Sequence, residues 1–182
     1  MASADEPISA SFIIEEVRIR RMERPLLRQN MFKGEDYIAA LDQAATRYHK
    51  LALVVGRPGS GKTALLKAIS QQMQIPLLNL GLELSKKLLS LTIRERKLKA
   101  ADIIADLLDA DEPPRLAVDN TEIIFDPSLM LNPLGLLQNI SRTRLLIWSW
   151  NGEVDDGHIT YAYPGHPEYQ RIPFAEMTLI AL

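Results

Sequence analysis

A glycine-rich octapeptide between an apolar run and an amphipathic segment is the feature that most restricts how this chain can fold. The apolar run occupies residues 51–55, and its shortness and the turn after it predict a strand. The octapeptide GRPGSGKT follows at residues 56–63. Apolar residues then recur at helical spacing from Ala64 to Met73, which predicts a helix. A strand, a glycine-rich turn and a helix in this order indicate an α/β fold.

The octapeptide fits the pattern GxxxxGK[ST], which is typical of phosphate binding. Glycines let successive N–H groups point inward at phosphate oxygens, and the following helix adds the positive end of its dipole. We expect Lys62 to reach the β- and γ-phosphates and the Thr63 hydroxyl to complete a magnesium shell. ATP and Mg²⁺ are therefore the predicted cofactors, and a chance glycine-rich turn is the alternative. The predicted nucleotide-binding residues are Gly56, Arg57, Pro58, Gly59, Ser60, Gly61, Lys62 and Thr63.

Further strands and helices alternate along the chain after this loop. Pro76 interrupts the first helical pattern, and the pair at residues 113–114 closes a later one. Asp126 and Asn132 each precede a proline, which predicts two short helical pieces in place of one long helix. The other predicted elements are strands at residues 77–80, 115–119 and 145–150 and helices around residues 84–91 and 97–110.

The last predicted strand, at residues 159–163, follows the one before it too closely for a parallel crossover. The predicted fold is therefore an α/β P-loop NTPase three-layer sandwich with a mostly parallel sheet and an antiparallel or off-sheet C-terminal strand. Only 19 residues follow Tyr163, so no helical lid domain is expected. We expect a basic N-terminal arm at residues 1–30 and a P-loop domain at residues 31–182.

Hydrolysis of a nucleotide also needs a carboxylate for the metal and a group that positions water. Asp119, at the end of a predicted strand, is the candidate metal ligand beside Thr63, and a turn-capping role is the alternative. Asn120 follows it and cannot act as a base. Glu122 is therefore the candidate catalytic base, with an ordinary surface ion pair as the alternative, and Glu83 is a weaker substitute.

Four further polar residues are catalytic candidates together with Lys62 and Glu122. Asn79 ends the second strand, where it could hold the catalytic carboxylate or water, or bond its own turn. Asn151 follows the fourth strand and could sense the γ-phosphate, although Asn-Gly is also a common tight turn. Arg142 and Arg144 are candidates for an arginine finger offered to an adjacent subunit, with solvated surface charge as the alternative.

Composition excludes several classes of protein. The chain has 182 residues without cysteine, which excludes a disulfide framework, a thiolate metal site and a cysteine nucleophile. Its 21 basic and 23 acidic residues balance, so coating nucleic acid is not its expected main work, although DNA could bind the arginine-rich arm. No apolar stretch approaches the roughly 20 residues that cross a bilayer, and the acidic start lacks a signal-peptide pattern. We expect a cytoplasmic protein without membrane contact.

Four segments together resemble the small P-loop protein of type-3 bacteriophage-exclusion (BREX) defence systems, a family in the AAA-like branch of P-loop NTPases. They are VVGRPGSGKT (54–63), LNLGLELSKKLLSLT (78–92), LAVDNTEIIFDPSL (116–129) and WNGEVDDGHITYAYPGHPEY (150–169). The resemblance implies partners that include a large ATPase and a DNA methyltransferase. It implies phosphate and magnesium roles for Lys62 and Thr63 and a metal role for Asp119. Asn120 departs from the common Asp-Glu pair, which argues against rapid autonomous hydrolysis.

The sequence therefore predicts a Mg-ATP-binding protein, expected to form a homo-oligomer, that hydrolyses ATP slowly or only when assembled and acts as a switch in a phage-defence complex. A scaffold that binds nucleotide without hydrolysing it is the rival from another class. A small-molecule kinase would share the same loop, but it needs a lid that the short C-terminus does not supply.

Overall fold

The computed structural model describes residues 31–33, 36–174 and 177–182. The predicted basic arm at residues 1–30 lies outside these residues, and so do its proposed contacts with DNA.

Parallel strands form the main sheet, in the order β1-β9-β2-β5-β4-β3. The strands are β1 (Met31–Lys33), β2 (Leu51–Gly56), β3 (Leu77–Asn79), β4 (Arg115–Asp119), β5 (Leu145–Asn151) and β9 (Thr178–Ala181). Since β5 lies between β2 and β4, the carboxyl ends of these three strands meet at one edge of the sheet. Ligands bind at this edge in open α/β folds.

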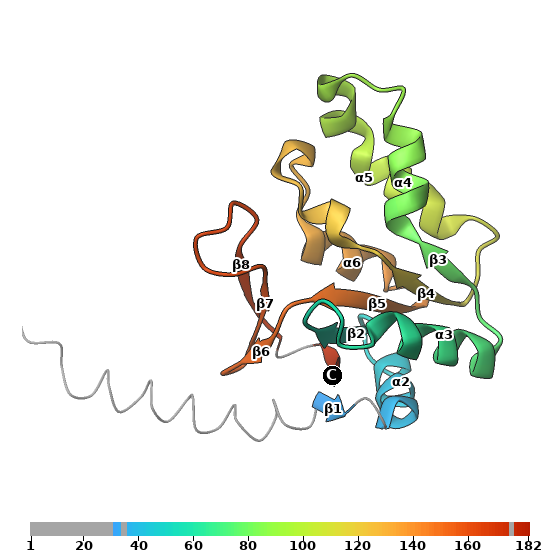
Figure 1. Ribbon diagram of the computed structural model, residues 1–182. Coiled ribbons are helices and arrows are strands. Elements are labelled where there is room, and N and C mark those ends of the chain that lie inside the picture. Colours follow the sequence, from blue (N-terminus) through green and yellow to red (C-terminus); the bar gives the residue numbers. More distant parts are fainter. Residues whose placement is uncertain (1–30, 34–35, 175–176) are drawn as a thin grey trace, which may run out of the picture.

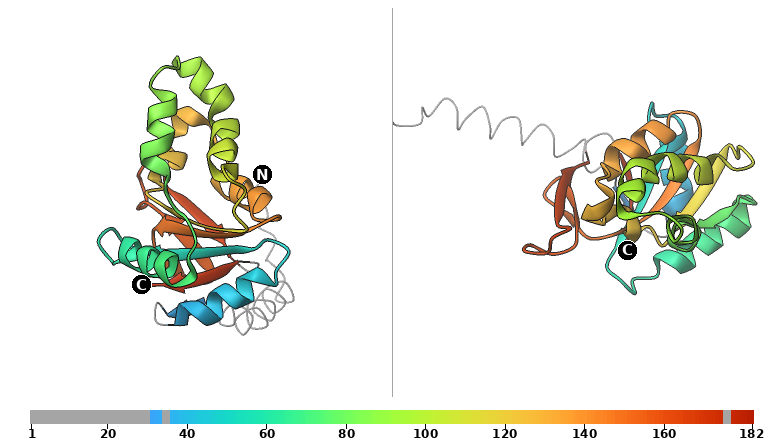
Figure 2. Two further views of the ribbon diagram at one scale, coloured as in Figure 1. Left: turned by 90° about the vertical axis from the view of Figure 1, so that its right-hand side faces the viewer. Right: turned by 90° about the horizontal axis from the view of Figure 1, so that it is seen from above.

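Helices cover both faces of this sheet, as Figures 1 and 2 show. They are α2 (Tyr37–Ala45), α3 (Lys62–Met73), α4 (Leu80–Leu88), α5 (Ile93–Asp109) and α6 (Pro133–Ile140). In β2, Ala52 and Val54 pack in the core beneath α2 and α3, whereas Leu53 and Val55 pack in the core beneath the other three helices. A strand alternates its side chains between faces, so a strand buried on both faces reads as a continuous apolar run. The predicted three-layer α/β sandwich is confirmed.

Side chains predicted to cap helices do so in the structure. The Asn132 side chain accepts a hydrogen bond from the Gly135 N–H at the start of α6 (3.1 Å). Asp126 does the same for Ser128 (2.8 Å) at the 3₁₀ helix η3 (Pro127–Leu129). An additional 3₁₀ helix, η2 (Glu122–Phe125), follows β4 directly. The two prolines therefore divide this region into short helices, as their positions predict.

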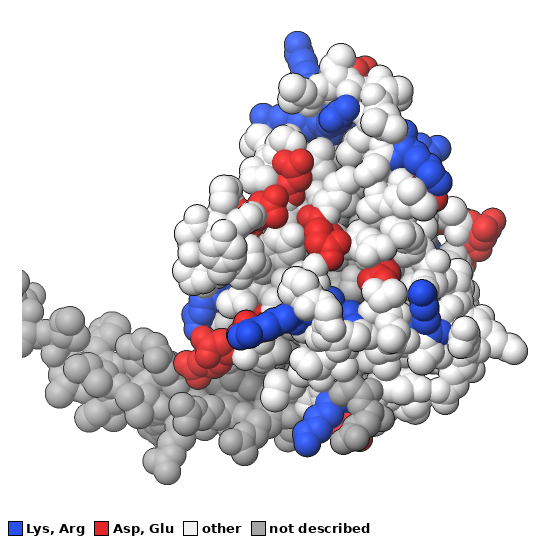
Figure 3. Space-filling view, viewed as in Figure 1, with Lys and Arg blue, Asp and Glu red and all other residues white. Residues whose placement is uncertain are grey.

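The α4 and α5 helices form a hairpin that rises from the sheet (Figure 1). Its turn is fixed by Arg96, whose Nε donates to the carbonyl oxygens of Leu88 and Leu91 (3.0 Å each). Basic side chains gather at the upper end of the face in Figure 3, over this hairpin, and acidic side chains lie nearer its middle. No helix in the described part of the chain is long and apolar enough to cross a membrane.

A separate antiparallel sheet stands beside the main one and consists of β6 (Val154–Asp155), β7 (His158–Tyr161) and β8 (Gln170–Pro173). The expectation that the strand near residues 159–163 is antiparallel or lies off the main sheet is confirmed, since β7 is both. The chain then returns to the main sheet as β9, which pairs with β1 on one side and β2 on the other. Neither β1 nor β9 shows a local pattern that predicts a strand.

Candidate nucleotide-binding site

The glycine-rich loop joins the carboxyl end of β2 to the start of α3. Gly59 and Gly61 have positive φ angles of 82° and 100°, which L side chains adopt only with strain. A Cβ atom added at either position would meet nothing within 4 Å. Backbone conformation, and not lack of space, is therefore what requires glycine at both positions.

The first turn of α3 leaves its N–H groups available to an anion. Gly61 is the N-cap residue and supplies no side-chain hydrogen bond to the helix. The first N–H groups of a helix have no partner within the helix, and the helix dipole makes this end electropositive. The loop and helix start can thus hold phosphate oxygens with backbone donors.

Lys62 is the buried cation of the loop, with only 7% of its surface exposed. Its ammonium donates to the carbonyl oxygens of Gly56 and Arg57 at 2.8 Å each. An ammonium has three donors, so one remains for a phosphate oxygen. Burial lowers the pKa of Lys62, and the nearby carboxylates of Glu122 and Asp119 act in the opposite direction. The cation therefore lies within the field of both predicted acidic site residues.

A cavity of about 550 Å³ brings the loop together with the ends of β4 and β5. Its lining residues are Pro58, Gly59, Gly61, Lys62, Thr63, Ala64, Lys67, Asp119, Asn120, Glu122 and Asn151. This volume lies within the usual range for small-molecule sites. The predicted phosphate, metal and base residues thus share one cavity, although they come from distant parts of the sequence.

Thr63 and Asp119 offer this cavity a hydroxyl and a carboxylate. Asp119 ends β4 and is only 6% exposed. Among the described residues, no group of three or more His, Asp or Glu side chains could form a cage for a metal. Mg²⁺ is usually held by one or two carboxylates together with phosphate oxygens and water, so the donors present fit this ion.

Glu122 and Asn151 are joined directly. The Asn151 side-chain amide donates to the Glu122 carboxylate, which fixes one of its oxygens and leaves the other for a different partner. Beside this pair, the hydroxyl of buried Thr121 donates to the Ser149 carbonyl oxygen at 2.7 Å. The start of η2 is thereby tied to β5, and the predicted base and the predicted sensor form one unit.

Asn120, directly after Asp119, has a backbone conformation that suits asparagine. Its φ angle is 55°, in the left-handed region that asparagine tolerates better than most residues. Its carbonyl oxygen accepts a hydrogen bond from the Gly81 N–H in the first turn of α4 (2.9 Å). A Cβ atom at Gly81 would lie 2.8 Å from that oxygen. The residue therefore serves a tight contact between β4 and α4.

Asn79 and Glu83 make contacts outside the cavity. The Asn79 side-chain oxygen accepts from the Leu82 N–H (3.0 Å) and so caps α4. This contact is the turn role that the sequence indicates as one of two alternatives for Asn79. For the catalytic alternative, only the amide nitrogen of the side chain would be available as a donor. Glu83 pairs with Lys86 on the exposed side of the same helix.

Arg142 and Arg144 lie before the amino end of β5. Because all strands of the main sheet are parallel, this end is opposite the edge that carries the glycine-rich loop. Arg144 is 11% exposed, pairs with Asp109 and donates to the Leu108 carbonyl oxygen (2.8 Å). The Arg142 guanidinium lies over the ring of Tyr48 at 5.1 Å. An arginine finger at either residue would therefore have to act on a neighbouring subunit.

A second hollow, of about 450 Å³, adjoins the first residues of the loop. Arg57 and Ser60 line it on the loop side, and Val55, Val154 and Leu182 supply apolar walls. The Arg57 guanidinium pairs with the carboxylate of Glu153, which lies between β5 and β6. The hydrogen bond from Arg57 lowers the pKa of Glu153. Sequence reasoning missed Glu153 and Thr121, because only the fold brings them to the loop and to β5.

One family model matches the chain, that of the ATPase family associated with various cellular activities (AAA), over residues 52–122. The match runs from β2 to the first residue of η2, which is less than half of the chain. Searches of the curated proteins and of the solved structures found no match. The matched segment carries the glycine-rich loop and Asp119, and it supports an AAA-like P-loop nucleotide-binding domain.

Proposed function

We propose that this chain binds Mg-ATP and hydrolyses it slowly or only when assembled, as a nucleotide switch. The observation that carries the proposal is the shared cavity in which a backbone cradle, a buried lysine, a hydroxyl and two carboxylates meet. A site for a neutral ligand would not require phosphate-binding and metal-binding groups to lie together in one cavity.

The proposed reaction is attack of water on the γ-phosphate. The loop N–H groups and Lys62 hold the phosphates and stabilise the charge that develops on their oxygens. The free Glu122 oxygen orients the water and takes its proton, while the bond between the γ-phosphorus and the bridging oxygen of ADP breaks. Mg²⁺, held by Thr63 and Asp119, would supply charge neutralisation of the phosphates when bound.

The second hollow is the proposed place of the nucleoside. It adjoins Gly56 and Arg57 at the beginning of the loop, whereas the phosphate cavity adjoins Lys62 and Thr63 at its end. A nucleotide whose phosphates lie at the start of α3 would then place its nucleoside at the other end of the loop, in the second hollow. The apolar side chains of Val55, Val154 and Leu182 suit the flat face of a base.

The proposed biological setting is a bacterial phage-defence complex, in which this chain forms homo-oligomers and contacts a large ATPase and a DNA methyltransferase. The support for this setting is the resemblance of four sequence segments to the BREX family. Arg142, which is exposed, is the better candidate for a finger, because the Asp109 pair already occupies Arg144. The basic arm at residues 1–30 is the proposed contact with DNA.

Comparison of Glu122→Gln with the parent protein tests the proposed reaction. Glutamine keeps the size and the contact with Asn151 but cannot take a proton, so we expect triphosphate affinity to persist and phosphate release to fall about 100-fold or more. Phosphate release should be followed with and without partner proteins and DNA, and particle mass should be recorded in parallel.

Two outcomes of this experiment would change the proposal. Equal phosphate release by Glu122→Gln and the parent would remove Glu122 from the reaction. Saturable ATP binding without any phosphate release, even in the native assembly, would favour the non-hydrolysing scaffold. Asn120 and the engaged Glu122–Asn151 pair are the features that keep this second function open.

A further inference from the structure

The small antiparallel sheet contacts the neighbours of Glu122 and Asn151 at two points, and neither contact residue lines the phosphate cavity. The first contact is between aromatic rings. Tyr161 of β7 stacks on Phe125, with ring centroids 3.5 Å apart and an angle of 9° between the rings. Phe125 ends the four-residue helix η2, and Glu122 begins it. A displacement of the Phe125 ring therefore moves the element that carries Glu122.

The second contact reaches the partner of Glu122. Trp150 directly precedes Asn151, and its Nε1 donates to the Thr160 carbonyl oxygen at 2.8 Å. The Trp150 ring also meets Phe125 edge to face, with centroids 4.9 Å apart. Thr160 and Tyr161 are neighbours on β7. One strand, β7, is thus linked to both members of the Glu122–Asn151 pair. It contacts Phe125, on the same helix as Glu122, and Trp150, which precedes Asn151.

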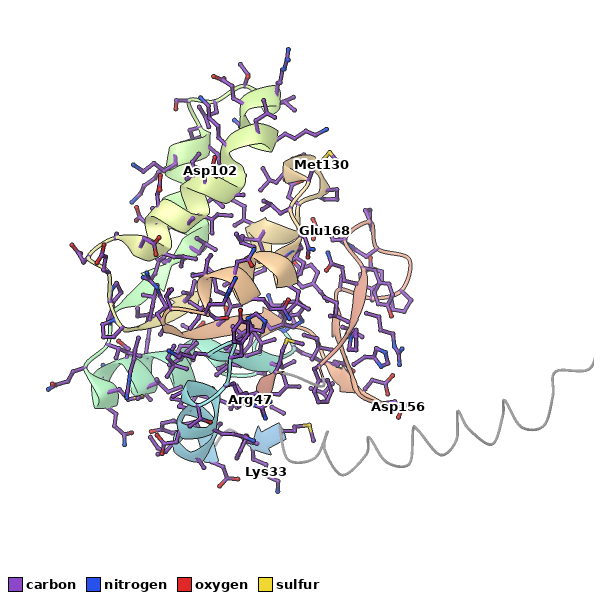
Figure 4. All side chains as sticks on the ribbon, turned by 180° about the vertical axis from the view of Figure 1, so that it is seen from behind. Lys33, Arg47, Asp102, Met130, Asp156 and Glu168 are labelled. Atoms are coloured by element: carbon purple, nitrogen blue, oxygen red, sulfur yellow. The ribbon has the colours of Figure 1, made fainter. Side chains whose placement is uncertain are left out.

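Close packing makes this connection stiff. Phe125, Trp150 and Tyr161 are 3%, 0% and 6% exposed. A Cβ atom at Gly152 would lie 1.7 Å from the Thr160 carbonyl oxygen, so β7 approaches the end of β5 as closely as glycine allows. Burial, followed by the charges of Glu168 and Glu122, raises the pKa of Tyr161. Figure 4 shows Glu168 on the side of the β7–β8 connection that faces the body of the protein.

We propose that Tyr161 and Trp150 are positioning residues, through which the β6–β8 sheet holds Glu122 and Asn151 in the geometry that hydrolysis requires. This inference rests on the proposed function. Displacement of a catalytic group by about 1 Å can reduce the rate about 100-fold, so a small shift of this sheet is enough to slow turnover. The groups proposed to hold the phosphates lie on the glycine-rich loop and α3, outside this sheet, so such a shift should lower turnover much more than triphosphate affinity.

Substitution of Tyr161 tests this role. Tyr161→Ala should lower kcat by roughly 10-fold or more and leave triphosphate affinity within about twofold of the parent. Tyr161→Phe keeps the ring and should retain most of the parent kcat. Tyr163→Ala is the matched control, because Tyr163 is exposed and its ring meets His166 instead of Phe125. If Tyr161→Ala fails to fold, Trp150→Phe is the second variant. It keeps a ring but removes the donor to Thr160, so it should lower kcat in the same way and leave triphosphate affinity unchanged.

A double-mutant cycle separates positioning from general stabilisation. If Tyr161 acts through Glu122, Tyr161→Ala should have no further effect on kcat in the Glu122→Gln background, because interacting residues are not additive. An equal loss in both backgrounds, or parent-like kcat in folded Tyr161→Ala and Trp150→Phe, would overturn the inference. A parent protein that releases no phosphate even in its native assembly would instead remove the proposed function, and this inference with it.

Discussion

At the scale of single residues, the site contains two kinds of residue. The position of some in the sequence motif indicates their role, and the role of the others becomes clear only from their neighbours in the structure. Lys62 follows the loop pattern, and its burial and its bonds to loop carbonyls agree with it. No sequence motif indicates a role for Asn120. Its left-handed backbone suits asparagine, and its main-chain carbonyl accepts the hydrogen bond from Gly81. Glu122 is therefore the residue that we propose for the hydrolytic role.

Asp119 provides the prediction at this scale. Asp119→Asn removes the charge of the proposed metal ligand, so we expect the Mg²⁺ concentration for half-maximal turnover to rise roughly 10-fold or more. Phosphate release titrated with Mg²⁺ measures this. Asp126→Asn is the control, because asparagine caps η3 as well as aspartate does. An unchanged Mg²⁺ requirement in Asp119→Asn would show that the carboxylate is not a metal ligand.

At the scale of elements, the structure shows how local signals shape the α4–α5 hairpin. Thr92 and Glu95 form a capping box at the start of α5, in which each side chain binds the backbone N–H of the other residue. The hydrogen bonds from Thr92 lower the pKa of Glu95. Such a box satisfies two of the donors that a helix start leaves without partners. The hairpin therefore has a rigid turn although it extends away from the sheet.

Thr92→Ala tests the capping box. Loss of the side-chain acceptor should reduce the free energy of unfolding by about 1 kcal/mol, the usual cost of removing such a cap. Thermal and denaturant unfolding measure this change. Thr92→Ser retains the acceptor and should behave like the parent, and triphosphate affinity should be the same in all three proteins. Equal destabilisation by alanine and serine would mean that the cap is not what stabilises the turn.

At the scale of the whole molecule, periodicity and turn chemistry predicted the strands around the loop, the helices between them and the departure of β7 from the main sheet. They did not predict β1 or β9. Each has at most four residues and pairs with segments distant in sequence, so no local pattern indicates its place. For the same reason the sequence indicates Glu122 and Asn151 as separate candidates. Their hydrogen bond follows from the strand order, which places β5 beside β4, and so does the packing of Tyr161 on Phe125.

The central claim is that the loop at residues 56–63 binds a nucleoside triphosphate beside Mg²⁺. Equilibrium binding of a labelled ATP to the full chain, with Lys62→Ala as the comparison, tests it most directly. We predict saturable binding by the parent and affinity at least about 30-fold weaker in Lys62→Ala, because the variant leaves phosphate charge without its cation. Absence of saturable binding by the parent, for both adenine and guanine triphosphates and also in its native assembly, would contradict the account.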